Sequence, residues 1–131
     1  MSKLVFWTYT YKCIHGKANM DNMTLAHQVS ELHAELCSAL ADSNRLLILY
    51  ALSEQKSNVS DLAEKIGISQ PAASRHLKIL RERGLVRAER QGPSVEYELT
   101  DHRLIEALDT LLTVLRDRVN YRANLLELPE E

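Results

Sequence analysis

The sequence predicts a mainly α-helical fold with one β-hairpin, and three observations lead to this prediction. The chain has 131 residues, which suits one compact domain. It holds only four Gly and three Pro, and its single Phe and single Trp leave the core to aliphatic residues, which favours helices packed on helices. From Thr24 on, apolar residues recur every three or four positions, except near residues 85–99, where they alternate.

The first 20 residues show no helical period, and we treat them as an N-terminal arm. A short strand, an ordered arm and a disordered tail all remain open for it. A single domain is predicted over residues 21–127. Its first helix begins near Thr24, and Asp42 caps a second helix. Residues 46–52 of this second helix are apolar almost all round, which predicts the central buried helix.

Two short helices follow a polar loop at residues 53–58. Ser60 is the predicted N-cap of the first, and Gly67 ends it. Ser69 is the predicted N-cap of the second helix, which has Pro71 in its first turn and stops at Gly84. Its inward-facing residues are predicted to be Ala73, Leu77 and Leu80.

Two alternating runs, residues 85–91 and 95–99, flank Gly92-Pro93-Ser94 and predict a β-hairpin. Thr100 or Asp101 then caps a long last helix. Its apolar stripe is wider and longer than one core needs, so we expect a second copy of the chain to pack on the first and last helices. The predicted dimer interface is Leu25, Val29, Leu32, Leu36, Leu104, Leu108, Leu111 and Leu115.

Two helices joined by a Gly turn and followed by a hairpin are typical of a winged helix-turn-helix, whose second helix enters the major groove of DNA. The charge distribution agrees with this. Residues 69–91 hold six Lys or Arg and two Glu, a net charge of +4, which leaves −6 on the rest of a chain whose total is −2. A basic segment on an acidic body is expected of a protein that meets phosphate with one face.

The recognition helix is therefore predicted to be residues 69–83, and the hairpin is predicted to be the wing. Gln can pair with adenine and Arg with guanine through two hydrogen bonds, so Gln70, Ser74 and Arg75 are the predicted base readers. Wing cations are expected to reach phosphates or the minor groove. The full predicted DNA-binding set is Ser69, Gln70, Ser74, Arg75, His76, Lys78, Arg87, Arg90 and Gln91.

Two segments resemble the ArsR/SmtB family of metalloregulatory repressors: ADSNRLLIL at residues 41–49 and ISQPAASRHLKILRERGLV at residues 68–86. The wing, with Gly92, Val95, Tyr97 and Leu99, is similar too, and the resemblance covers about residues 25–120. It implies a homodimer, an inverted-repeat operator in double-stranded DNA and release by a ligand. Pro93 departs from the family, which usually has a basic residue there, and this bears on one wing–phosphate contact.

The sensor sites that the resemblance implies do not match this sequence. Residues 59–63 have no cysteine for a metal site on the first helix of the helix-turn-helix. The last helix opens with Asp101 and His102, but its far end offers only Asp117, and the family's pair of sulfur-sensing cysteines is missing. His27 and His102 are expected on the surface.

One N-terminal group of potential ligands remains. Cys13, His15, His33 and Cys37 could together hold a tetrahedral Zn²⁺ or another soft ion, and His33 and Cys37 share one helical face. The simpler interpretation makes Cys37 a small buried apolar residue. No cofactor is predicted beyond this soft metal ion.

Other function classes find less support. We see no Gly-rich phosphate loop, nucleophile elbow or metal-hydrolase helix motif, so an enzyme is not expected. No apolar run reaches the roughly 18–20 residues that cross a bilayer, and we expect a cytoplasmic protein without a membrane partner. The alternative is a winged-helix protein–protein interaction module that does not bind DNA.

Overall fold

A computed structural model describes residues 20–126, and at residues 20–24 and 124–126 it describes the backbone alone. The chain divides into two compact units, residues 1–41 and 42–131. The described part of the first unit is helix α2, Met20–Leu40, which begins four residues before the predicted start at Thr24. Its apolar stripe is largely exposed, because Leu25, Val29 and Leu32 are 57–65% accessible to solvent.

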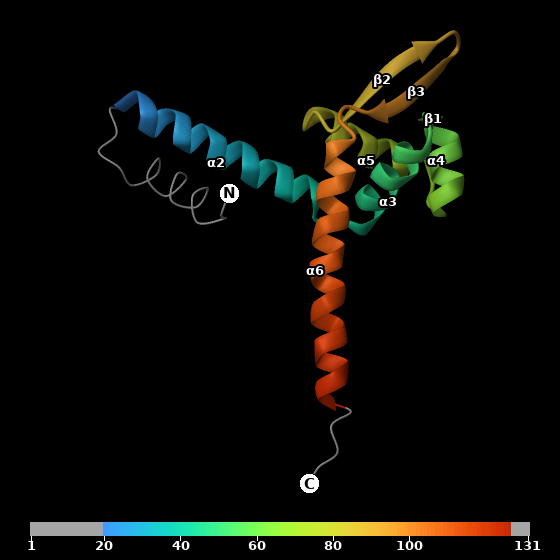
Figure 1. The fold of residues 1–131 in the computed structure, drawn as a ribbon. Helices are drawn as coiled ribbons and strands as arrows, with labels where there is room; N and C mark the ends of the chain where they lie inside the picture. Colours follow the sequence, from blue (N-terminus) through green and yellow to red (C-terminus); the bar gives the residue numbers. More distant parts are fainter. Residues whose placement is uncertain (1–19, 127–131) are drawn as a thin grey trace. The chain divides into compact units, whose positions relative to one another are not determined.

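The second unit contains the predicted helix-turn-helix and hairpin (Figure 1). None of the helices between residues 20 and 126 combines the length and the hydropathy of a membrane span. The elements of this unit are α3 (Ser43–Glu54), β1 (Ser57–Asn58), α4 (Val59–Ile66), α5 (Gln70–Glu82), β2 (Val86–Gln91), β3 (Ser94–Leu99) and α6 (Arg103–Leu126).

Helix α3 lies at the centre of the core, as predicted, but it is not buried all round. Asp42 caps it by accepting hydrogen bonds from the backbone amides of Asn44 and Arg45, at 2.9 and 3.1 Å. Leu47 remains 49% exposed, so one side of this apolar helix is not covered within the unit. The largest fully buried side chains of the unit are Ile48, Leu49, Leu62, Leu77 and Leu80.

The hairpin is part of a three-stranded antiparallel sheet with the order β1-β3-β2. Gln91 pairs with Ser94, so Gly92 and Pro93 form a two-residue turn. Gly92 has φ +60°, as expected at the first central position of a tight hairpin turn, where Gly is favoured. Strand β1 lies in the predicted loop; two residues are too few to produce an alternating pattern, and Ser57 pairs with Tyr97 of β3.

Helix α6 packs on α3 through its first turns only. The Asp101 carboxylate accepts a hydrogen bond from the Arg103 amide at 2.9 Å, as expected for a residue at the start of a helix. Leu108 is only 7% exposed, and the Tyr50 hydroxyl donates a hydrogen bond to Asp109 at 2.9 Å. Leu111 and the described residues after it are exposed. The stripe on α6 therefore divides into a part that serves its own core and a part that faces solvent.

Candidate nucleic-acid interface

The turn between α4 and α5 is stabilised by hydrogen bonds at both ends. Gly67 has φ +73° and ends α4 in the left-handed conformation, as its sequence position predicts. The Ile68 amide then donates to the carbonyl of Ala63 at 3.0 Å, and the Ser69 hydroxyl caps α5 by accepting from the Ala72 amide at 3.3 Å. These bonds fix where α5 begins relative to α4.

The cap of α4 corrects one prediction. Asn58, not Ser60, is the N-cap, because its side-chain oxygen accepts a hydrogen bond from the Asp61 amide at 2.8 Å. Ser60 lies inside the helix, and its exposed hydroxyl accepts a hydrogen bond from the side-chain amide of Gln70 at 2.7 Å. The predicted base reader Gln70 is therefore held by a residue of the preceding helix.

Helix α5 has one buried face and one exposed, basic face. Ala73, Leu77 and Leu80 are fully buried, as predicted. Ser74 and Arg75 are exposed in the first two turns after the cap. The exposed Lys78 lies 3.9 Å from Glu82, one turn further on. Within residues 20–126, Arg75 forms no ion pair, which leaves its guanidinium open to a partner outside the chain.

His76 differs from the other predicted contacts because it is half-buried and faces its own core. Its Nδ1 is buried, lies 3.8 Å from an oxygen of Asp42, and receives no hydrogen bond from the residues described. The hydrogen bond from the Arg45 amide is the main cause that lowers the pKa of Asp42, and the charge of His76 lowers this pKa further. His76 thus lies against the cap of α3, unlike the exposed Ser74 and Arg75 on the same helix.

The wing carries cations in two different environments. Arg87 is paired with Glu98 on the neighbouring strand, with Nε and Oε1 2.6 Å apart, and Lys56 lies 3.2 Å from the same carboxylate. The hydrogen bond from Arg87 is the main cause that lowers the pKa of Glu98. Arg90, nearer the turn, donates only to the backbone carbonyl of Gly92, at 3.3 Å. Arg87 is therefore neutralised within the wing, and Arg90 is not.

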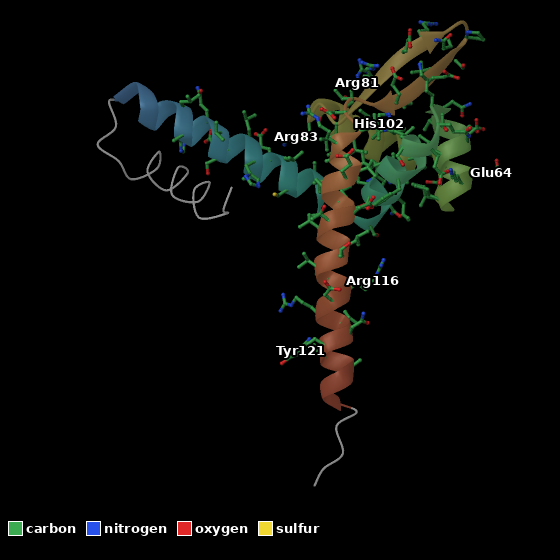
Figure 2. The ribbon with its side chains drawn as sticks, viewed as in Figure 1. Glu64, Arg81, Arg83, His102, Arg116 and Tyr121 are labelled. Carbon is green, nitrogen blue, oxygen red and sulfur yellow. The ribbon has the colours of Figure 1, made fainter. Side chains whose placement is uncertain are left out.

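A hollow of about 380 Å³ lies between the exposed face of α5 and strand β3. Arg81 in its lining lies near the base of the hairpin (Figure 2). We did not predict Arg81 or Tyr97 as site residues. The spacing of Ser74, Lys78 and Arg81 on one helical face could have indicated Arg81. Tyr97 could not have been found in this way, because the register of the sheet places it beside α5. The lining residues are Ser74, Leu77, Lys78, Arg81, Glu82 and Tyr97.

The proposed N-terminal metal group is described only in part. Cys13 and His15 lie outside the described residues. His33 and Cys37 lie one turn apart on α2 and are both exposed, so Cys37 is not the small buried residue that we expected. No group of three or more His, Cys, Asp or Glu side chains within the described part of the chain is arranged to hold a metal ion. His27 and His102 are exposed, as predicted.

Comparisons with known proteins agree with this architecture. A family model described as "Bacterial regulatory protein, arsR family" matches residues 42–88. The HTH-type transcriptional regulator NmtR of Mycobacterium tuberculosis is 40% identical over 91 residues, which are 70% of this chain and 76% of that protein.

Solved structures extend the likeness to the fold. The crystal structure of NolR from Sinorhizobium fredii has a TM-score of 0.62 at 35% identity, over 67% of this chain and 88% of that one. The homodimeric winged helix-turn-helix DNA-binding domain of Mb0332 from Mycobacterium bovis has a TM-score of 0.67 at 23% identity, over 82% and 94% of the two chains, and supports the fold alone. The chain therefore belongs to the ArsR/SmtB family of winged helix-turn-helix transcriptional regulators.

Proposed function

We propose that this protein is a dimeric repressor that binds an inverted-repeat operator in the cytoplasm and leaves it when an inducer binds. The observation that carries the proposal is the exposed first half of α5, which presents Gln70, Ser74 and Arg75 on a helix capped by Ser69. Residues at the start of a recognition helix are the ones that reach base edges in the major groove. Ser69 and Lys78 are proposed contacts to the DNA backbone, and Arg90 and Gln91 are the proposed wing contacts.

The dimer part of the proposal follows from exposed apolar surface. On α2, Leu25, Val29 and Leu32 are exposed and Leu36 is half-buried; on α6, Leu111 and Leu115 are exposed by 58% and 56%. Two stripes of this length on one chain favour burial against a second copy. Leu104 is half-buried and Leu108 is buried within its own unit, so we place the interface mainly beyond Leu108 on α6.

A two-fold axis would present two copies of α5 to neighbouring major grooves about 34–36 Å apart. The operator is then expected to be an inverted repeat with half-sites about one helical turn apart.

The test is binding to DNA selected from a library of random duplexes. Arg75→Ala should weaken binding to the selected operator by roughly 1–3 kcal/mol per contact and relax the preference at one base position. Arg103→Ala is the matched control, because Arg103 is exposed in the first turn of α6, before the part that we place in the interface, and this variant should bind like the wild type. If the wild type selects no sequence and binds no duplex, the interaction-module alternative replaces this proposal.

A further inference from the structure

The hydrogen bond between Gln70 and Ser60 joins the two helices of the helix-turn-helix on the exposed side of the protein. The Nε2 atom of Gln70, the first residue of α5, lies 2.7 Å from the hydroxyl oxygen of Ser60, the second residue of α4. Both residues are exposed. The bond therefore lies at the start of the recognition helix, on a surface that DNA can reach.

Both partners are attached to rigid backbone. Asn58 holds the first turn of α4 by accepting from the Asp61 amide at 2.8 Å and donating to the Asp61 carboxylate at 3.0 Å. Gln70 directly follows the cap residue Ser69. The backbone that carries the Ser60 side chain is thus held by the cap of one helix, and the backbone at Gln70 is held by the cap of the next.

The bond to Ser60 restricts what the Gln70 side chain presents. A Gln amide has two N–H donors and one carbonyl oxygen that can accept. Ser60 uses one of these donors. When that donor is the N–H trans to the carbonyl oxygen, the other N–H and the carbonyl oxygen remain side by side. Adenine presents an acceptor at N7 and a donor at N6 in the major groove, and this pair matches the free edge of the amide. Without the bond to Ser60, the amide can rotate, and fewer of its orientations present this edge to adenine.

We infer that Ser60 is a positioning residue that sets an adenine preference at one base pair of each half-site by holding the amide of Gln70. This inference rests on the proposed function, because it requires Gln70 to face the operator. Ser60 itself reads no base in this scheme. The bond to its hydroxyl limits the orientations that the Gln70 amide adopts before DNA binds. We therefore expect Ser60 to affect the discrimination between bases.

The experiment compares base preferences rather than affinity alone. The operator is obtained by selection from random duplexes, and each base pair of its half-site is then replaced in turn and titrated with wild type, Ser60→Ala, Ser60→Thr and Gln70→Ala. Ser53→Ala is the matched control, because it removes a hydroxyl that bonds to the Tyr50 carbonyl within α3, at 2.6 Å. Thermal unfolding of each variant checks that the fold is kept.

Wild type should prefer adenine at one position by roughly tenfold, which lies within the range for a good two-bond contact. Gln70→Ala should remove this preference. Ser60→Ala should reduce it at the same position, with unchanged affinity for scrambled DNA, and Ser60→Thr should restore it because the hydroxyl returns. The double variant Ser60→Ala/Gln70→Ala should behave as Gln70→Ala does, because Ser60 acts through Gln70.

Three results would overturn the inference. The first is a full adenine preference in Ser60→Ala while Gln70→Ala has lost it. The second is an equal loss of affinity for every sequence in Ser60→Ala, which would make the hydroxyl a backbone contact. The third is an unchanged preference in Gln70→Ala, which would remove Gln70 from base reading. In all three cases the wild type still binds its operator, so the proposed function survives; only a wild type without operator binding defeats that function itself.

Discussion

Replacing Arg81 and Arg87, one at a time, by Gln should separate a cation that meets DNA from one that stiffens the wing. Arg81 lines the hollow between α5 and β3 and makes no ion pair within residues 20–126. When α5 lies in the major groove and the hairpin in the next minor groove, we expect the DNA backbone between the two grooves to pass over this hollow. Arg87 is already paired with Glu98 at 2.6 Å.

The size of the effect follows from counterion release. Each phosphate contact contributes about 0.9 to the slope of log K against log salt concentration, and a dimer carries Arg81 twice, so Arg81→Gln should flatten the slope by about 1.8. Over a fourfold rise in salt, this is about a tenfold smaller loss of affinity. Arg87→Gln should leave the slope unchanged, because the charge that it removes is neutralised within the protein.

The assay is a set of fluorescence anisotropy titrations on operator and scrambled duplexes at about 50, 100 and 200 mM salt, a range over which phosphate contacts are measurable. Arg81→Gln should flatten the slope on both duplexes, because a backbone contact carries no sequence information. An unchanged slope in Arg81→Gln, or an equal flattening in Arg87→Gln, would refute the reasoning. The second result would mean that the Arg87–Glu98 pair opens on DNA.

Three further predictions concern assembly, the cap of α3 and the thiol. Leu111→Glu places a charge in the proposed apolar interface, so sedimentation should change from about twice the 14.9 kDa chain mass to the single chain, with the helical content kept. The pKa of Asp42 lies below its usual 3.8, so its stabilisation is present above that pH and is lost as the pH falls through the folded-state pKa. Asp42→Asn should keep the cap and remove this acid loss in a pH series of melting curves, whereas Asp42→Ala should cost about 0.5–2 kcal/mol at neutral pH. Cys37→Ser should change the free energy of unfolding by less than about 0.5 kcal/mol, because the side chain is exposed; a larger change would show that the site is covered in the dimer.

The elements that the sequence predicted well are those set by local backbone chemistry. Gly67 ends α4 at positive φ, Ser69 caps α5, and Pro71 occupies the first turn, where its missing N–H is harmless. Each of these signals acts within one turn of its own residue. The bounds of the recognition helix could therefore be predicted from the sequence without knowledge of any tertiary contact.

The features that the sequence did not predict depend on contacts between distant residues. Tyr97 joins the hollow through pairing with Ala88 and Ser57, and a two-residue strand carries no pattern of its own. His76 looks like one more polar residue on a basic helix, yet its ring lies against the cap of α3, 34 positions earlier. Neither fact follows from periodicity, because both depend on how α5 is oriented over the core.

Contacts between distant residues also change how the charge of the basic segment should be interpreted. Residues 69–91 contain six Lys or Arg, but the surroundings of these cations differ. Arg87 is paired across the hairpin, and an exposed Lys78 faces Glu82 at 3.9 Å. Within the described residues, no carboxylate pairs with Arg75, Arg81 or Arg90.

Ion pairs at the wing neutralise cations and also connect the strands of the sheet. Arg87 and Glu98 are direct partners in the register of β2 and β3, and Lys56, just before β1, lies 3.2 Å from Glu98 and 3.8 Å from Glu89. Each exposed pair contributes about 0–1 kcal/mol, but together they span the three strands of a sheet whose hairpin alone would be only marginally stable. The cations nearest the body thus hold the wing in place, and Arg90 near the turn remains open to phosphate.

The three arginines without a carboxylate partner, together with the proposed backbone contact Lys78, make eight cations per dimer and a total salt slope of about −7.2. Counting all six cations of residues 69–91 in each protomer gives about −10.8. A measured slope near the smaller value would support the proposed set of contacts, and one near the larger value would show that DNA also meets the remaining cations, Arg87 among them.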